Sequence, residues 1–305
     1  MLARTKSARR LTGLEIRRAL TIVTALSFLP QLHRIWTQKT SKGISTDYVF
    51  WNLLCATEQF KFFVYLLIAK DPEQNIPLVY DPPTFGDRLN MYQTAVVWLS
   101  FFTLFGACLR HTPSKSFYVI AYALYITISI VPPILDILYG FPSPDHTYAD
   151  PLASGIFFLS MCLLNPLVSV LVVYAVFSQI REINSARGPE LSIPPGNALS
   201  ICGLAVQAVV FAAVAFTWIW RVPIENARLG WDTWSWTVVG LDNLMYWYNL
   251  VGFPAFDNGV FAMGQGVLFA SAWRRRKGRE NAVDREPLLG RSGYRTTKFV
   301  PLCNE

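Results

Sequence analysis

Long, mostly apolar segments recur along the whole chain, and they constrain the fold more than any other feature. Seven of them have about the 20 residues that an α-helix needs to cross a bilayer core of about 30 Å. They are residues 19–36, 48–69, 91–109, 117–139, 152–177, 199–220 and 254–273. Because lipid cannot pair backbone polar groups, such segments form helices. The sequence therefore predicts an all-α integral membrane protein with seven transmembrane helices.

An eighth candidate, residues 234–251, is shorter and contains Asp242 and Asn243. Its Trp and Tyr residues are typical of a helix that lies at the boundary between water and lipid. We expect an interfacial helix, while an eight-span alternative stays open. The choice also decides the side of the N-terminus, because an even number of spans places both ends on one side of the membrane.

The basic charge of the chain lies at its two ends. The net charge is +7, yet residues 1–18 carry six Lys or Arg against one Glu, and residues 274–305 carry nine against four acids. Basic residues beside spans are typical of topology signals and of contact with anionic lipid, and no basic-aromatic nucleic-acid module is present. We expect the lipid bilayer as partner, and no nucleic acid. The run at 274–277 predicts a cytoplasmic C-terminus.

These patterns divide the chain into a basic N-terminal segment (1–18), a transmembrane domain (19–273) and a disordered basic tail (274–305). The end of the first span carries the most informative motif. Pro30 inside a membrane helix removes one backbone hydrogen bond, and Gln31 can pair with the freed groups. The residues that follow suit a tight turn, a helix N-cap and a first helical turn: Gly43, Ser45 or Thr46, and Asp47.

In this order and spacing the motif resembles the PQ-loop family, which includes the lysosomal cystine exporter, vacuolar basic-amino-acid transporters and the SWEET sugar transporters. The matching residues are Pro30, Gln31, Trp36, Lys39, Gly43, Ser45, Asp47 and Asn52. The resemblance implies a 3+1+3 arrangement, two three-helix bundles joined by a linker helix, with substrate between the bundles. It also implies that Pro30 and Gln31 form a hinge and that Asp47 takes part in proton or substrate binding.

The second repeat that the family carries is degenerate here, because no second Pro-Gln occurs. Pro132 and Pro133 lie in the fourth span, and Asn165-Pro166 in the fifth span lacks the Lys-Gly-Ser continuation. A symmetric transport cycle with two intact motifs is therefore not expected from the sequence.

Polar residues in the second span form a stripe on one helix face, which we expect to face the bundle interior. Its members are Asp47, Trp51, Leu54, Glu58, Lys61 and Tyr65. Glu58 and Lys61 are three residues apart and can neutralise one another. In the other interpretation Glu58 titrates or binds a cationic group while Lys61 tunes it. Both interpretations stay open.

Two further polar sets are candidates for substrate or proton binding, or for hydrogen bonds between helices. They are Asn52 and Gln59 in the second span, and Asp257, Asn258 and Gln265 in the last. Glycines in the last span favour close helix packing: Gly259, Gly264 and Gly266. Neither histidines at ligand spacing nor a nucleophile or dinucleotide motif occurs, so we expect no catalytic residue, metal or cofactor.

The function hypothesis is a transporter of a small polar solute such as an amino acid, another small metabolite or a sugar, with proton coupling as an open feature. Asp284, Leu288 and Leu289 resemble an acidic dileucine signal, which favours a vacuolar or other endomembrane and a sorting adaptor as partner. The alternatives are a membrane-embedded biosynthetic enzyme similar to terpene cyclases, with Glu58 and Asp257 as acids, or a non-transporting receptor or scaffold.

Overall fold

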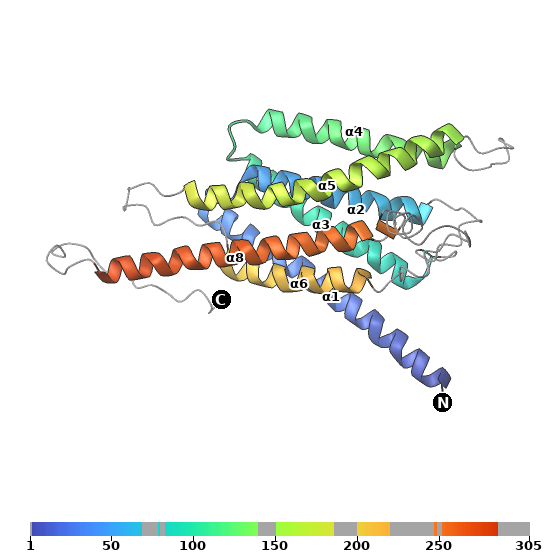
Figure 1. The fold of residues 1–305 in the computed structure, drawn as a ribbon, viewed down its shortest axis with the longest axis horizontal. Helices are drawn as coiled ribbons and strands as arrows, with labels where there is room; N and C mark the ends of the chain where they lie inside the picture. The colour runs from blue at the N-terminus through green and yellow to red at the C-terminus, as the bar shows by residue number, and fades with distance from the viewer. Residues whose placement is uncertain are drawn as a thin grey trace, which may run out of the picture.

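The computed structural model describes residues 2–68, 79, 83–139, 151–185, 200–219, 247–248 and 252–285, with side chains except at 2–14 and 279–285 (Figure 1). This part of the chain holds seven helices and no strand. Four of them are long and apolar enough to cross a membrane: α3 (Phe85–Leu109), α4 (Lys115–Tyr139), α5 (Pro151–Ser185) and α6 (Ile201–Ile219). The others are α1 (Leu2–Gln38), α2 (Thr46–Ile68) and α8 (Phe253–Arg285). The prediction of an all-α membrane protein is confirmed.

The seven helices alternate in direction, as seven spans require. The start of α1 and the end of α8 lie at opposite ends of the bundle (Figure 1). We use the term connection end for the end that holds the α1–α2 connection (39–45) and the α3–α4 connection (110–114). The eighth candidate span, 234–251, lies outside the described residues apart from 247–248.

The helices form two groups of three. In the first group α3 packs against both α1 and α2, and in the second group α8 packs against both α5 and α6. The groups meet where α2 packs against α5 and α1 packs against α6. The first helix of each group thus contacts the second helix of the other, which is the pattern of two parallel repeats about a two-fold axis. Helix α4 joins the groups in sequence and packs against α5 and α2.

The outer helices are longer than the apolar segments that predicted them. Helix α1 begins at Leu2, within the basic N-terminal segment, and α8 continues to Arg285, within the stretch expected to be a disordered tail. Arg, Lys, Glu and Ala are good helix formers, which accounts for the extension of α8. The Arg275 guanidinium also donates a hydrogen bond to the Ile183 carbonyl of α5 and so holds this part of α8 against α5.

The α1–α2 connection has the predicted turn and cap. Gly43 has a φ of +89°, a conformation that glycine adopts at little cost. The Ser45 hydroxyl accepts a hydrogen bond from the Tyr48 N–H at 3.4 Å, so Ser45 is the N-cap of α2. Asp47 lies in the first turn, where the helix dipole favours a carboxylate.

Pro30 lies where the two groups of helices meet. A Cβ built on Gly203 of α6 would stand 3.6 Å from the Pro30 Cβ. Beside it, the Gln207 side chain donates a hydrogen bond to the Ser27 carbonyl at 3.4 Å. Pro30 cannot donate to the Leu26 carbonyl, and the donor from α6 bonds the next carbonyl along α1.

Four phenylalanines, one from each of α1, α3, α6 and α8, close the space between the groups on the α1–α6 side. They are Phe28, Phe101, Phe211 and Phe261, and all four are buried. Each ring packs against two others, with centroid distances between 4.5 and 6.1 Å. Aromatic pairs in this range add about 0.5–1.5 kcal/mol beyond their buried area. This side of the contact between the groups is a packed apolar core.

Candidate functional site

The polar stripe of α2 faces α4. Four hydrogen bonds join the two helices between residues 71 positions apart, so α2 and α4 run parallel in a fixed register. The pairs are Asp47 with Tyr118, the Leu54 carbonyl with Tyr125, Glu58 with Ser129, and Asp136 with Tyr65. The stripe is thus directed at the linker helix and not at the α8 side of α2.

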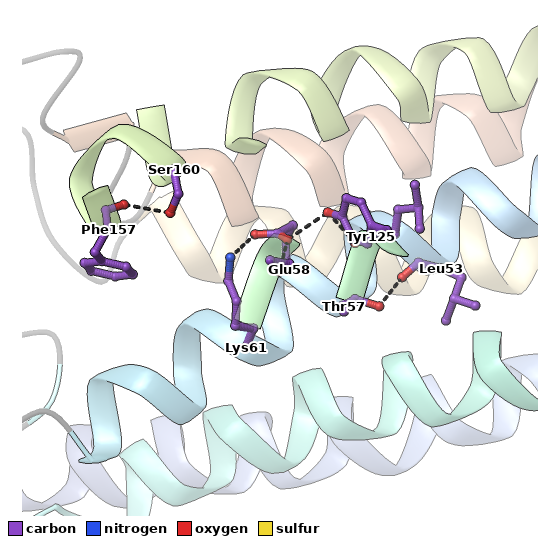
Figure 2. Close-up of polar contacts among 9 residues, drawn as sticks. Leu53, Thr57, Glu58, Lys61, Tyr125, Phe157 and Ser160 are labelled. Atoms are coloured by element: carbon purple, nitrogen blue, oxygen red, sulfur yellow. Dashed lines mark hydrogen bonds and ion pairs between the residues drawn. The ribbon is translucent and has the colours of Figure 1, made fainter. Parts of the chain in front are cut away.

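Glu58 is the most heavily bonded carboxylate of this stripe, and it is 1% exposed. Figure 2 shows its carboxylate between Lys61 and Tyr125. The Lys61 ammonium forms an ion pair with Oε2, while the hydroxyls of Tyr125, at 2.8 Å, and Ser129 donate to Oε1. Every charge in this cluster has a partner, which makes its burial tolerable. The arrangement favours the interpretation of Glu58 and Lys61 as a neutralised pair.

Two further carboxylates, one on α2 and one on α4, lie at the two ends of this contact. Asp47 accepts a hydrogen bond from the Tyr118 hydroxyl at 2.5 Å. Asp136 of α4 is buried and accepts hydrogen bonds from Tyr65 and, at 2.7 Å, from Ser154 of α5. Hydroxyl donors thus tie α4 to its neighbours at three levels.

Asp257 of α8 lies against a different face of α2, where helices of both groups meet, and it is 1% exposed. Its Oδ1 accepts a hydrogen bond from Ser169 of α5. Its Oδ2 accepts from the Cys55 thiol at 3.1 Å and from the Gln59 amide at 3.4 Å, both of α2. Tyr248 lies behind, with its hydroxyl 2.9 Å from Ser169 Oγ.

The donors that the structure gives Asp257 are neutral. Within the described residues the ion pairs are Lys61 with Glu58 and Arg18 with Glu15, and Asp257 belongs to neither. A buried carboxylate without a countercharge is expensive, and in membrane proteins such groups are functional candidates by default. Two buried acids thus lie beside α2, and among the described side chains Glu58 has a countercharge and Asp257 has none.

Asn258 joins this cluster, as one of the sequence candidates. Its amide donates to the Gln59 carbonyl oxygen at 3.4 Å and to the Pro254 carbonyl at 2.5 Å. Asn52, by contrast, donates to the Tyr48 carbonyl of its own helix at 2.7 Å. We use the term Asp257 centre for the residues bonded around this carboxylate: Cys55, Gln59, Ser169, Asp257 and Asn258.

Two buried amides near the Asp257 centre have an atom without a partner in the described part of the chain. They are Asn165, 3% exposed, at Nδ2, and Gln265, 0% exposed, at Oε1. The Ser169 hydroxyl oxygen also lies 3.1 Å from the Asn165 backbone carbonyl, which places Asn165 one turn from the centre. Gln265 donates to the Tyr48 hydroxyl at 2.5 Å, on the same α2 face as Cys55. Buried polar groups normally have partners, so these two atoms are candidates to bond a water molecule or a ligand.

Gln179, at the connection end, is a further buried polar residue that sequence reasoning missed. It is 0% exposed and lies at the connection end, where its Oε1 accepts from the Ser45 N–H at 2.8 Å and its Nε2 donates to the Gly43 carbonyl at 2.7 Å. Ser178 adds a hydroxyl contact to Ser45 at 2.6 Å. Ser169, Tyr125 and Ser129 were missed as well, since a single hydroxyl in an apolar span gives no local signal of its partner.

The remaining sequence candidates have no described contacts at these sites. Leu288 and Leu289 lie outside the described residues, as does the side chain of Asp284. Gln31 is buried next to Pro30 in α1, which leaves the hinge a prediction. Among the described residues no group of three or more His, Cys, Asp or Glu is placed to hold a metal ion.

Comparison with known proteins agrees with the motif at the start of the bundle. The family model described as PQ loop repeat matches residues 19–68, which cover most of α1, the connection and α2. Searches among curated proteins and among solved structures gave no match. The matched helices belong to a bundle whose other spans include four that are long and apolar enough to cross a membrane. The chain is a multi-pass membrane protein with a PQ-loop repeat at residues 19–68.

Proposed function

We propose that the protein transports a small polar solute across an endomembrane and that Asp257 is its central binding group. The observation that carries this proposal is the buried Asp257 carboxylate with neutral donors at the contact of α2, α5 and α8. A proton or a cationic group of a solute would supply the missing charge. A solute that carries a cationic group, or that binds together with a proton, would compensate the buried Asp257 charge, whereas an apolar molecule would not.

The position of the centre suits a transport cycle. Asp257 and Ser169 come from the second group of helices, whereas Cys55 and Gln59 come from the first. A ligand held between them is bound by both groups at once. If the groups tilt relative to one another, the same ligand is exposed first to one side of the membrane and then to the other, as in transporters built from parallel repeats.

Proton coupling and the endomembrane location belong to the proposal. Asp257 takes up and releases a proton as its neutral partners move, which links the solute to a proton gradient. The residues Asp284, Leu288 and Leu289 support vacuolar sorting through an adaptor. The enzyme alternative assigns the proton-donating role to Glu58, whose carboxylate is already engaged by the Lys61 ammonium.

The test is uptake by proteoliposomes that hold the full chain. Labelled amino acids, sugars and small organic acids are offered one at a time, with and without an imposed proton gradient. We expect at least one solute to accumulate above the level of protein-free vesicles, and accumulation to increase with the gradient. The Asp257→Asn variant should lose this uptake, and Glu15→Gln, which changes an exposed acid of α1, should retain it. Uptake at the same rate by Asp257→Asn would remove Asp257 from the mechanism.

A further inference from the structure

Two adjoining cavities lie at the connection end, away from the Asp257 centre. The first has a volume of about 450 Å³ and the second about 550 Å³. Both are lined by Ser45, Asp47 and Glu182, so they are neighbours around the start of α2 and the end of α5. Their volumes are in the range of small-molecule sites. The transport proposal assigns them no role.

Charged side chains of both signs line these cavities. Lys42 lines the first cavity and Arg181 the second, and the shared acids Asp47 and Glu182 balance their formal charges. In the described part of the chain Lys42, Arg181 and Glu182 take part in no ion pair. Two cations and two acids that do not pair with one another suit a ligand that itself carries one charge of each sign.

The first cavity also has features that favour phosphate oxygens. The Ser41 hydroxyl lines it together with the His111 imidazole, and the Thr46 and Thr112 hydroxyls line it as a pair bonded to each other at 2.9 Å. Helix α2 begins at its wall, and the N-terminus of a 23-residue helix attracts an anion. The cations and these donors select a phosphate, whereas Asp47 and Glu182 select an amine.

The cavities lie at the ends of long helices, and the ends of membrane helices are where lipid head groups are found. Their walls come from the first turn of α2, the last turns of α5 and the α3–α4 connection, which are the ends of membrane helices. From the second cavity the outer face of α5 continues with exposed apolar side chains, Phe177 at 64% and Tyr174 at 53%. Figure 1 shows α4 and α5 diverging toward this end, and the hydrogen bond from Ser154 to Asp136 joins them at the other.

We infer that the two cavities bind the head group of a phospholipid that carries a phosphate and a primary amine, as phosphatidylethanolamine does. The phosphate lies against Lys42 and Arg181, the amine against Asp47 and Glu182, and an acyl chain follows Tyr174 and Phe177 along α5. A lipid with a net negative head group and no amine would place no positive charge beside Asp47 and Glu182. A free phosphoamine would leave the apolar face of α5 unused.

Native mass spectrometry of the delipidated full chain tests this inference without any solute. Phosphatidylethanolamine, phosphatidylglycerol and phosphatidylcholine with the same acyl chains are added separately, and the retained lipid is measured. We expect phosphatidylethanolamine to be retained most strongly. Lys42→Gln and Glu182→Gln should each weaken its apparent affinity about tenfold, the loss of one charged contact. Lys42→Arg, which keeps the charge, should bind like the original chain.

The matched control is Lys39→Gln, a change of an exposed lysine in the same connection that does not line either cavity. It should leave retention unchanged, and unfolding temperatures of all variants check that they are folded. The inference is wrong if phosphatidylglycerol is retained as strongly, if Lys39→Gln weakens binding as much as Lys42→Gln, or if free O-phosphoethanolamine binds as tightly as the lipid. Since no transport is measured, failure here leaves the transport proposal standing.

Discussion

The side chain of Gln179 is bonded to the backbone at Ser45 by an N–H···O contact of 2.8 Å that crosses from the second group of helices to the first. A second bond to the Gly43 carbonyl, at 2.7 Å, makes the contact bidentate. Any motion that separates α5 from the α1–α2 connection must break both bonds. The connection end of the bundle is therefore held shut at a defined place.

Replacing Gln179 by Ala should loosen this end. The Ser45 N–H and Gly43 carbonyl lose their partners, and bonds between membrane helices contribute roughly 0.6–1.7 kcal/mol each. We expect faster hydrogen exchange in peptides that cover residues 43–48, measured by mass spectrometry. Asn184→Ala, at an exposed position of the same helix, serves as the control. Equal exchange in the two variants would show that Gln179 does not hold the connection.

Cys55 provides a chemical probe of the Asp257 centre, because its thiol donates to the Asp257 carboxylate at 3.1 Å. Because Cys55 is buried, in a chain with the other cysteines replaced by Ala a membrane-permeable maleimide should react only when the helices move apart, and the adduct should block uptake. A transported solute should slow the modification several-fold, since it occupies the same space. Cys55→Ala should transport and be insensitive to the reagent. Modification at an unchanged rate in saturating solute would place the solute elsewhere.

The Glu58 and Lys61 pair should behave as a unit of stability. Lys61→Met leaves the buried Glu58 carboxylate without its countercharge, and breaking such a pair costs about 3–5 kcal/mol. Adding Glu58→Gln to that variant should restore most of the loss, because the remaining partners, Tyr125 and Ser129, can bond an amide. Unfolding in a denaturant series measures both. Loss of uptake in a stable double variant would instead favour the interpretation of Glu58 as a titrating group.

Gly264 allows α8 to approach α5 closely. A Cβ built on Gly264 would stand 2.4 Å from Val176 Cγ2, a distance that forces one of the two to move. Gly264→Ala should therefore lower the free energy of unfolding by about 1–3 kcal/mol. Val176→Ala in the same chain should recover part of it. Gly266→Ala, where a Cβ meets nothing within 4 Å, should change stability little, and an equal effect at both glycines would exclude the close contact as the cause.

The sequence predicted the helices well, because lipid demands long apolar segments and these stand out from the polar connections. It also predicted the turn at Gly43 and the cap at Ser45, which are local features of the backbone. It could not predict which face of α2 meets which neighbour. The stripe through Glu58 packs against the linker helix α4, and the Asp257 centre lies on another face of α2.

The partners of the candidate site depend on helix rotations that no single segment encodes. Gln59 and Asn258 were recognised as polar residues in apolar spans, but their hydrogen bond joins residues that are 199 positions apart in the sequence. Ser169 gave no signal at all, since a serine in a membrane helix usually bonds its own backbone. It does so here, to Asn165, and also reaches Asp257.

The bundle has an odd number of described spans, with α1 entering at one end and α8 leaving at the other (Figure 1). A bundle in which all seven described helices cross the membrane would place the basic segments of α1 and α8 in different compartments. An enzyme, adaptor or antibody confined to one side of the membrane would then meet one segment and not the other. In such a bundle the basic residues at the two ends cannot both follow the positive-inside rule. The number of spans would place one of the two clusters on the side of the membrane that its charge disfavours.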